Sequence, residues 1–129
     1  MLHHYIKKIF RIPWLPALMW AGLILWGSLV NEAPVLLPKQ QFLGADKLVH
    51  ALAYAGLGFL TLAGIKYHSK IKDSTLNTLL ALGICLFFGI ALEVVQGILV
   101  VERHFEYLDM LANAVGLGLG WIAYYLFIT

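Results

Sequence analysis

Residues 79–101, LLALGICLFFGIALEVVQGILVV, decide in which solvent this chain folds. The stretch is long enough to cross the ~30 Å hydrocarbon core of a bilayer, which takes about 20 apolar residues. It carries two polar side chains, Glu93 and Gln96, three residues apart. A charge at mid-span costs about 3 kcal/mol on insertion scales, whereas each Leu or Ile contributes about −0.5 kcal/mol. The apolar neighbours offset that cost, but Glu93 must face protein or water rather than lipid.

The rest of the chain is equally apolar, with 61% hydrophobic and 12% charged residues among 129. Soluble domains average about half apolar and a quarter charged residues, and a domain of this size cannot bury so much apolar surface. Three more stretches approach spanning length, so we expect membrane-spanning helices over 13–30, 48–65, 79–101 and 108–128. The sequence thus predicts an all-α integral membrane protein, a four-helix bundle in one domain over residues 1–129.

The basic residues are distributed unevenly around these spans. Six precede the first span or separate the second from the third: Lys7, Lys8, Arg11, Lys66, Lys70 and Lys72. The other two loops together hold three: Lys39, Lys47 and Arg103. Because cytoplasmic loops carry the excess of Lys and Arg, this bias predicts that both termini are cytoplasmic. The net charge of +2 is too small to indicate a nucleic-acid partner, and the lone Cys85 excludes an intrachain disulfide.

In that topology the remaining polar residues gather at the non-cytoplasmic ends of three spans. Asp46 and His50 are four residues apart, as are Asp109 and Asn113, so each pair shares one face of its helix. The third span repeats this with a three-residue spacing. We therefore expect a polar pocket that opens to the outside. The candidate ligand-binding residues are Asp46, Lys47, His50, Glu93, Gln96, Arg103, Asp109 and Asn113.

Small residues continue two of these faces. On the last span, Gly116 and Gly120 form a G-x-x-x-G pair, which permits close helix approach in membranes. On the second span, Ala51, Ala55 and Gly58 form a similar stripe, which would also permit a homodimer.

The ordered set of motifs resembles the VanZ-like family of small bacterial membrane proteins. The motifs are D-K-x-x-H at 46–50, E-x-x-Q at 93–96, Arg103, and D-x-x-x-N at 109–113 with trailing glycines. The resemblance extends over residues 46–120 and implies a multi-pass protein of the bacterial cytoplasmic membrane. The family takes its name from an accessory protein of glycopeptide resistance, linked to teicoplanin tolerance. Its members generally lack an established biochemical activity, so the resemblance implies a cell-envelope setting and no specific reaction.

Three interpretations of the polar set stay open. It can bind membrane lipids, with Arg103 and Lys47 holding the phosphate of an envelope lipid or cell-wall precursor. It can form a hydrolase site for a lipid headgroup, with His50, Glu93 and Asp109 as acid, base or metal ligands. It can also be a closed network that only fixes helix pairing. We expect no cofactor and no metal. The single histidine counts against a catalytic zinc site, which usually has two or three, whereas a hard divalent ion held by carboxylates stays open for the hydrolase interpretation.

Overall fold

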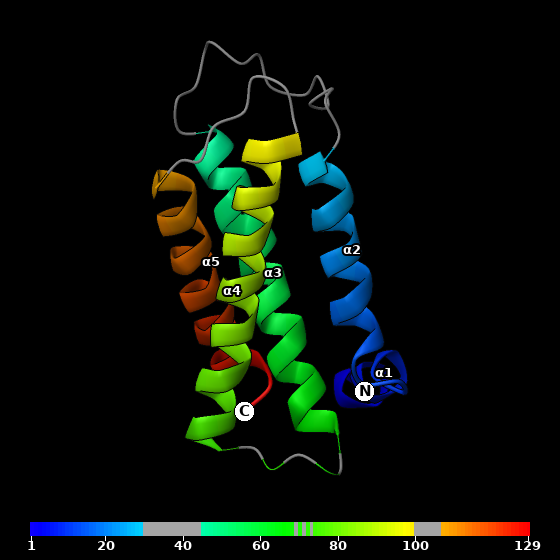
Figure 1. The fold of residues 1–129 in the computed structure, drawn as a ribbon. Coiled ribbons are helices and arrows are strands. Elements are labelled where there is room, and N and C mark those ends of the chain that lie inside the picture. Colours follow the sequence, from blue (N-terminus) through cyan, green and yellow to red (C-terminus); the bar gives the residue numbers. More distant parts are fainter. Residues whose placement is uncertain (30–44, 69, 71, 73, 100–106) are drawn as a thin grey trace.

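The computed structural model describes residues 1–29, 45–68, 70, 72, 74–99 and 107–129. These residues form five α-helices and, within the described ranges, no strand (Figure 1). The helices are α1 (Leu2–Ile9), α2 (Leu15–Leu29), α3 (Ala45–Tyr67), α4 (Thr75–Leu99) and α5 (Tyr107–Phe127). The all-α class predicted from the sequence is confirmed. The loop that precedes α3 and the one between α4 and α5 lie outside the described residues.

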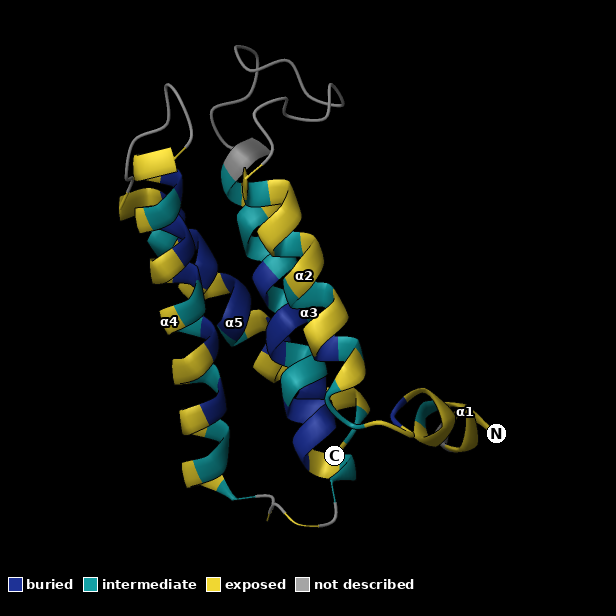
Figure 2. Ribbon diagram, turned by 45° about the vertical axis from the view of Figure 1, so that its right-hand side comes forward, coloured by how far each residue is buried: buried dark blue, intermediate teal, exposed yellow. Residues whose placement is uncertain are grey.

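Three of the described helices are long and apolar enough to cross a membrane, over Lys47–Tyr67, Thr75–Leu99 and Tyr107–Phe127. The helix α2 is also apolar, but its 15 residues span only ~22 Å. All four predicted spans correspond to helices, and α3 and α4 begin three and four residues earlier than predicted. Exposed residues, yellow in Figure 2, cover the outer faces of the bundle. Many of them are large and apolar, as lipid contact requires.

The sequence did not predict α1, which projects sideways from the lower end of α2 (Figure 2). Its apolar side chains Leu2 and Ile9 are exposed, while Lys7 and Lys8 occupy its last turn. The separation of apolar and basic side chains on α1 is typical of a helix that lies along a membrane surface. The next residue, Phe10, is buried and stacks on Tyr67 of α3, with ring centroids 5.5 Å apart.

The helices run so that both chain termini lie at one end of the bundle (Figure 1). The opposite end holds the start of α3, the end of α4 and the start of α5. These are the three segments that carry the predicted polar residues. The up-and-down course of α3, α4 and α5 therefore brings those residues to a common level.

The closest contact in the bundle joins α3 and α5. A Cβ atom added at Gly116 would lie 2.2 Å from the carbonyl oxygen of Ala51, and one at Gly120 would lie 2.3 Å from that of Ala55. The neighbouring atoms are backbone and cannot move aside, so only glycine fits at these positions. The G-x-x-x-G prediction is confirmed. The small stripe of α3 packs against α5 within the chain, and does not face outward to a second copy.

We predict that Gly116→Ala lowers the stability of the bundle by about 3 kcal/mol or more, because the added methyl group must push α3 and α5 apart. The measurement is the thermal unfolding midpoint of the purified protein in detergent. Gly118→Ala is the matched control on the same helix, since an added Cβ there meets no atom within 4 Å. Equal midpoints for the two variants would contradict the proposed close approach.

Candidate functional site

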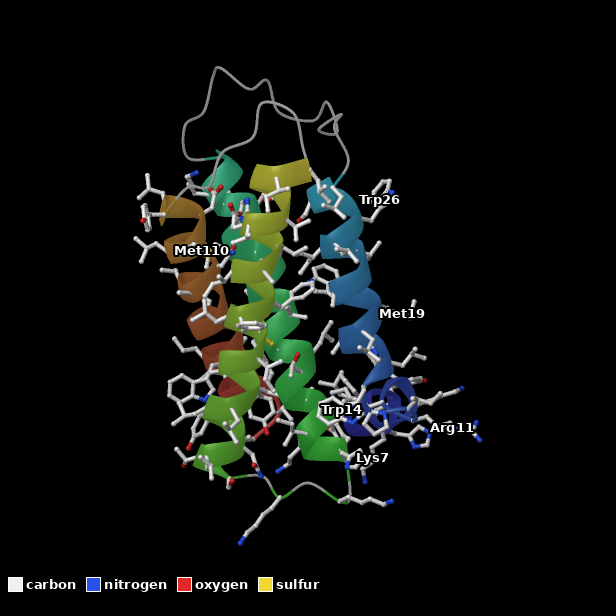
Figure 3. All side chains as sticks on the ribbon, viewed as in Figure 1. Lys7, Arg11, Trp14, Met19, Trp26 and Met110 are labelled. Atoms are coloured by element: carbon white, nitrogen blue, oxygen red, sulfur yellow. The ribbon has the colours of Figure 1, made fainter. Side chains whose placement is uncertain are left out.

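Five of the eight predicted side chains meet at the end of the bundle opposite the chain termini. Lys47 and His50 come from α3, Glu93 from α4, and Asp109 and Asn113 from α5. We call these five residues the polar cluster. Met110, the neighbour of Asp109, marks its level in Figure 3. Helical spacing explains why they meet. Lys47 and His50 share one face of α3, Asp109 and Asn113 share one face of α5, and the glycine contact turns these two faces toward each other.

His50 stands at the centre of the polar cluster. Its Nδ1 lies 2.9 Å from Oδ1 of Asn113, within hydrogen-bond distance, and 4.0 Å from Oε1 of Glu93. Its Nε2 lies 4.0 Å from Oδ2 of Asp109. The other oxygen of Asp109 forms an ion pair with the Nζ of Lys47. One imidazole thus contacts or approaches side chains from two other helices, and Asp109 divides its two oxygens between an amine and this ring.

The charged groups of the polar cluster differ in their exposure. The side chains of Lys47 and His50 are 26% and 17% exposed, whereas those of Asp109 and Glu93 are 11% and 4% exposed. Asn113 is also buried, and its amide oxygen can accept a hydrogen bond from Nδ1 of His50 and so orient the ring.

Gly89 on α4 makes room for the base of the cluster. A Cβ atom added there would lie 3.0 Å from the hydroxyl oxygen of Tyr54 and 3.1 Å from Nδ2 of Asn113. The ring of Tyr54 is buried one helical turn after His50. The absence of a side chain at Gly89 therefore lets the phenol and the amide fill the space between three helices. Tyr54 follows His50 by four residues and so shares its helix face, but only the tertiary structure sets its contact with α4.

The structure places the side chain of Gln96 against α2. It is buried, and its Nε2 donates a hydrogen bond of 2.7 Å to the main-chain carbonyl of Ser28 on α2. A second bond of this kind joins Trp20 Nε1 on α2 to the carbonyl of Ala53, also at 2.7 Å. These two bonds fasten α2 to the rest of the bundle. The side chain of Asp46 and all of Arg103, the other two predicted residues, lie outside the described part of the chain.

Three members of the polar cluster have the donor atoms that a divalent cation needs. One ligand atom each from His50, Glu93 and Asp109 lies within 4.8 Å of the other two. Neighbouring ligands of a bound Zn²⁺ stand about 3–4 Å apart at bond lengths of about 2.0–2.2 Å, so side-chain rotations would have to close the set. Lys47 competes with a metal for Asp109. The sequence-based expectation that no metal is needed stays a prediction.

Comparison with known proteins adds no relative: no protein-family model, curated protein or solved structure matches this chain. The resemblance to the VanZ-like family stays a prediction that depends on the quoted motifs.

We predict that Gln96→Met lowers the thermal unfolding midpoint while leaving lipid binding intact. The substitution removes one hydrogen bond between buried groups, which costs about 1–3 kcal/mol because the Ser28 carbonyl loses its donor. Unfolding in detergent and lipid titration of the same preparation measure the two effects. Loss of lipid binding at an unchanged midpoint would instead place Gln96 in the ligand site.

Proposed function

We propose that the polar cluster binds the anionic headgroup of a cell-envelope lipid or of a lipid-linked precursor. The greater exposure of the lysine and the histidine is the observation that carries this proposal. The side chains of Lys47 and His50 are more exposed than the carboxylates of Asp109 and Glu93. A phosphate would therefore reach the Lys47 ammonium more easily than it would reach the two carboxylates.

The chemistry of each group supports an anion site. A lysine ammonium has three N–H donors, so Lys47 can contact Asp109 and a phosphate oxygen at the same time. Asp109 then acts as a positioning residue for the amine, as Asn113 does for the ring of His50. The low dielectric of the membrane strengthens such interactions. Arg103 remains part of the proposed site through its place in the sequence, because a guanidinium can bind a phosphate with two parallel hydrogen bonds.

The proposed setting is the bacterial cytoplasmic membrane, crossed four times, with the polar cluster toward its outer side. The six-to-three bias of basic residues and the position of both termini at one end of the bundle support cytoplasmic termini (Figure 1). In this topology α2 also crosses the membrane, and the bilayer accommodates its short length by local thinning. The motifs that resemble the VanZ-like family support the cell-envelope assignment.

The direct test compares removing and keeping the positive charge at Lys47. Purified protein in detergent is titrated with phosphatidylglycerol and with phosphatidylcholine of the same acyl chains, and bound lipids are counted by native mass spectrometry. We expect Lys47→Gln to weaken phosphatidylglycerol binding by about tenfold, because a hydrogen bond to a charged group contributes about 1.5–3 kcal/mol. Lys47→Arg, the matched control, keeps the cation and should retain most of this affinity. Equal affinities in Lys47→Gln and the wild type would refute the proposal.

Exchanging the ion pair separates a ligand site from a purely structural network. In Lys47→Asp with Asp109→Lys, the opposite charges still face each other, so the unfolding midpoint should recover relative to either single variant. The amine, however, then starts from the more buried position on α5. We therefore expect a folded protein that does not regain preference for phosphatidylglycerol. Recovery of stability and lipid preference together would indicate that the pair serves helix pairing alone.

The convergence of His50, Glu93 and Asp109 favours hydrolysis of a lipid headgroup as the second candidate function. A ring nitrogen and two carboxylates at this separation could move protons or hold a cation that activates water. Prolonged incubation in the same titrations distinguishes the two, since hydrolysis would convert the lipid to a product without its headgroup. Binding with no change in lipid mass favours recognition.

A further inference from the structure

A separate apolar groove lies in the half of the bundle that contains the chain termini. Its volume is about 560 Å³, and its walls come from α2, α3 and α4. Leu18, Leu80 and Ile84 line it and are themselves exposed, so the groove opens sideways, where a bilayer would present lipid. On α4 it extends from Asn77 to Phe88, which corresponds to ~16 Å along the helix. Its length and apolar walls match a lipid acyl chain.

Small side chains contribute to the space in the groove: Ala17 and Ala21 on α2, and Ala81 on α4, line it. The hydrogen bonds from Trp20 to the carbonyl of Ala53 on α3, and from Gln96 on α4 to the carbonyl of Ser28, hold α2 beside these two helices. Small residues on both walls leave space that larger side chains would fill, so the groove follows from the sequence of these two helices.

The lower end of the groove adjoins a basic surface. Trp14 lines the groove, and its ring lies 5.7 Å from that of His68 just beyond α3. Figure 3 shows Lys7 and Arg11 at this same end as Trp14. The other cations of the end are Lys8, Lys66, Lys70 and Lys72. The acidic residues within the described ranges all belong to the opposite end. In the sequence, the segments of this end hold one acidic residue, Asp73, against six basic ones, so the excess of positive charge here favours an anion.

We infer that this groove is a second lipid site, which holds one acyl chain of an anionic phospholipid whose headgroup is bound by the basic surface. The occupant is identified by charge complementarity at the headgroup end and by the apolar walls along the chain. The amphipathic α1 places Lys7 and Lys8 at the level of lipid headgroups. The inference is independent of the proposed function of the polar cluster, which lies at the other end of the bundle.

The position of Trp14 supplies a local probe of the groove. The full chain is reconstituted in vesicles of phosphatidylcholine that contain a small fraction of either brominated phosphatidylglycerol or brominated phosphatidylcholine. Bromine on an acyl chain quenches tryptophan fluorescence on contact, and the share of quenching lost in Trp14→Phe reports this ring. We expect brominated phosphatidylglycerol to quench Trp14 about threefold more than brominated phosphatidylcholine at equal fractions.

Two kinds of variant test the two halves of the site. The triple change Lys66→Gln, Lys70→Gln and Lys72→Gln involves exposed residues and should bring the quenching ratio close to one. Ala21→Phe fills the groove and should reduce quenching of Trp14 by both lipids. Ala91→Phe is its matched control, since Ala91 is exposed on α4 outside the groove, and it should change nothing.

Several outcomes would overturn the inference. Equal quenching of wild-type Trp14 by the two brominated lipids would show no preference for the anion. An unchanged signal in Ala21→Phe would show that the chain does not enter the groove, and no quenching by either lipid would indicate that a second copy of the protein covers it. Lys47→Gln should leave Trp14 quenching intact, so this site and the polar cluster can fail separately.

Discussion

The approach of α3 to α5 is the constraint on which the rest of the structure depends. At Gly116 and Gly120 the two backbones are so close that a single methyl group would collide with a carbonyl oxygen. In a membrane, where lipid is as apolar as leucine, this packing of backbone on backbone replaces the hydrophobic effect as the source of helix association. It also fixes the rotation of each helix about its own axis, because only one face of α5 lacks side chains.

That rotation determines the environment of the polar residues. The glycine face of α5 continues into Asn113 and Asp109, so the contact that joins the helices also places these side chains against His50 and Lys47 of α3. Placing an isolated carboxylate in hydrocarbon costs free energy. Asp109 lies next to the amine of Lys47, and Glu93 lies near the ring of His50. The bundle therefore tolerates Glu93 and Asp109 because close packing supplies their neighbours.

The two ends of the bundle differ in how they present charge. At one end a lysine and a histidine lie against two buried carboxylates in a compact cluster. At the other end exposed lysines and an arginine adjoin the lower end of an apolar groove, and they are spread over residues 7–11 and 66–72. The first arrangement suits selective contact with one small polar group. The second suits a lipid surface, where many weak contacts with headgroups add together.

Much of this protein follows from the sequence by itself. The apolar runs identified the three long helices and the shorter α2. The i, i+4 spacings placed Asp109 with Asn113 and predicted the glycine contact, because helical periodicity is a local property of the chain. The short α1 was missed, although its apolar residues recur with helical spacing, because its eight residues include histidines and lysines and so form no apolar run. Tertiary structure alone decided that Gln96 turns to α2 and that α2 leaves a groove beside α4. The partner of Gln96 is a main-chain carbonyl, which every residue possesses, so no pattern of side chains can specify it; only the positions of the helices in space do.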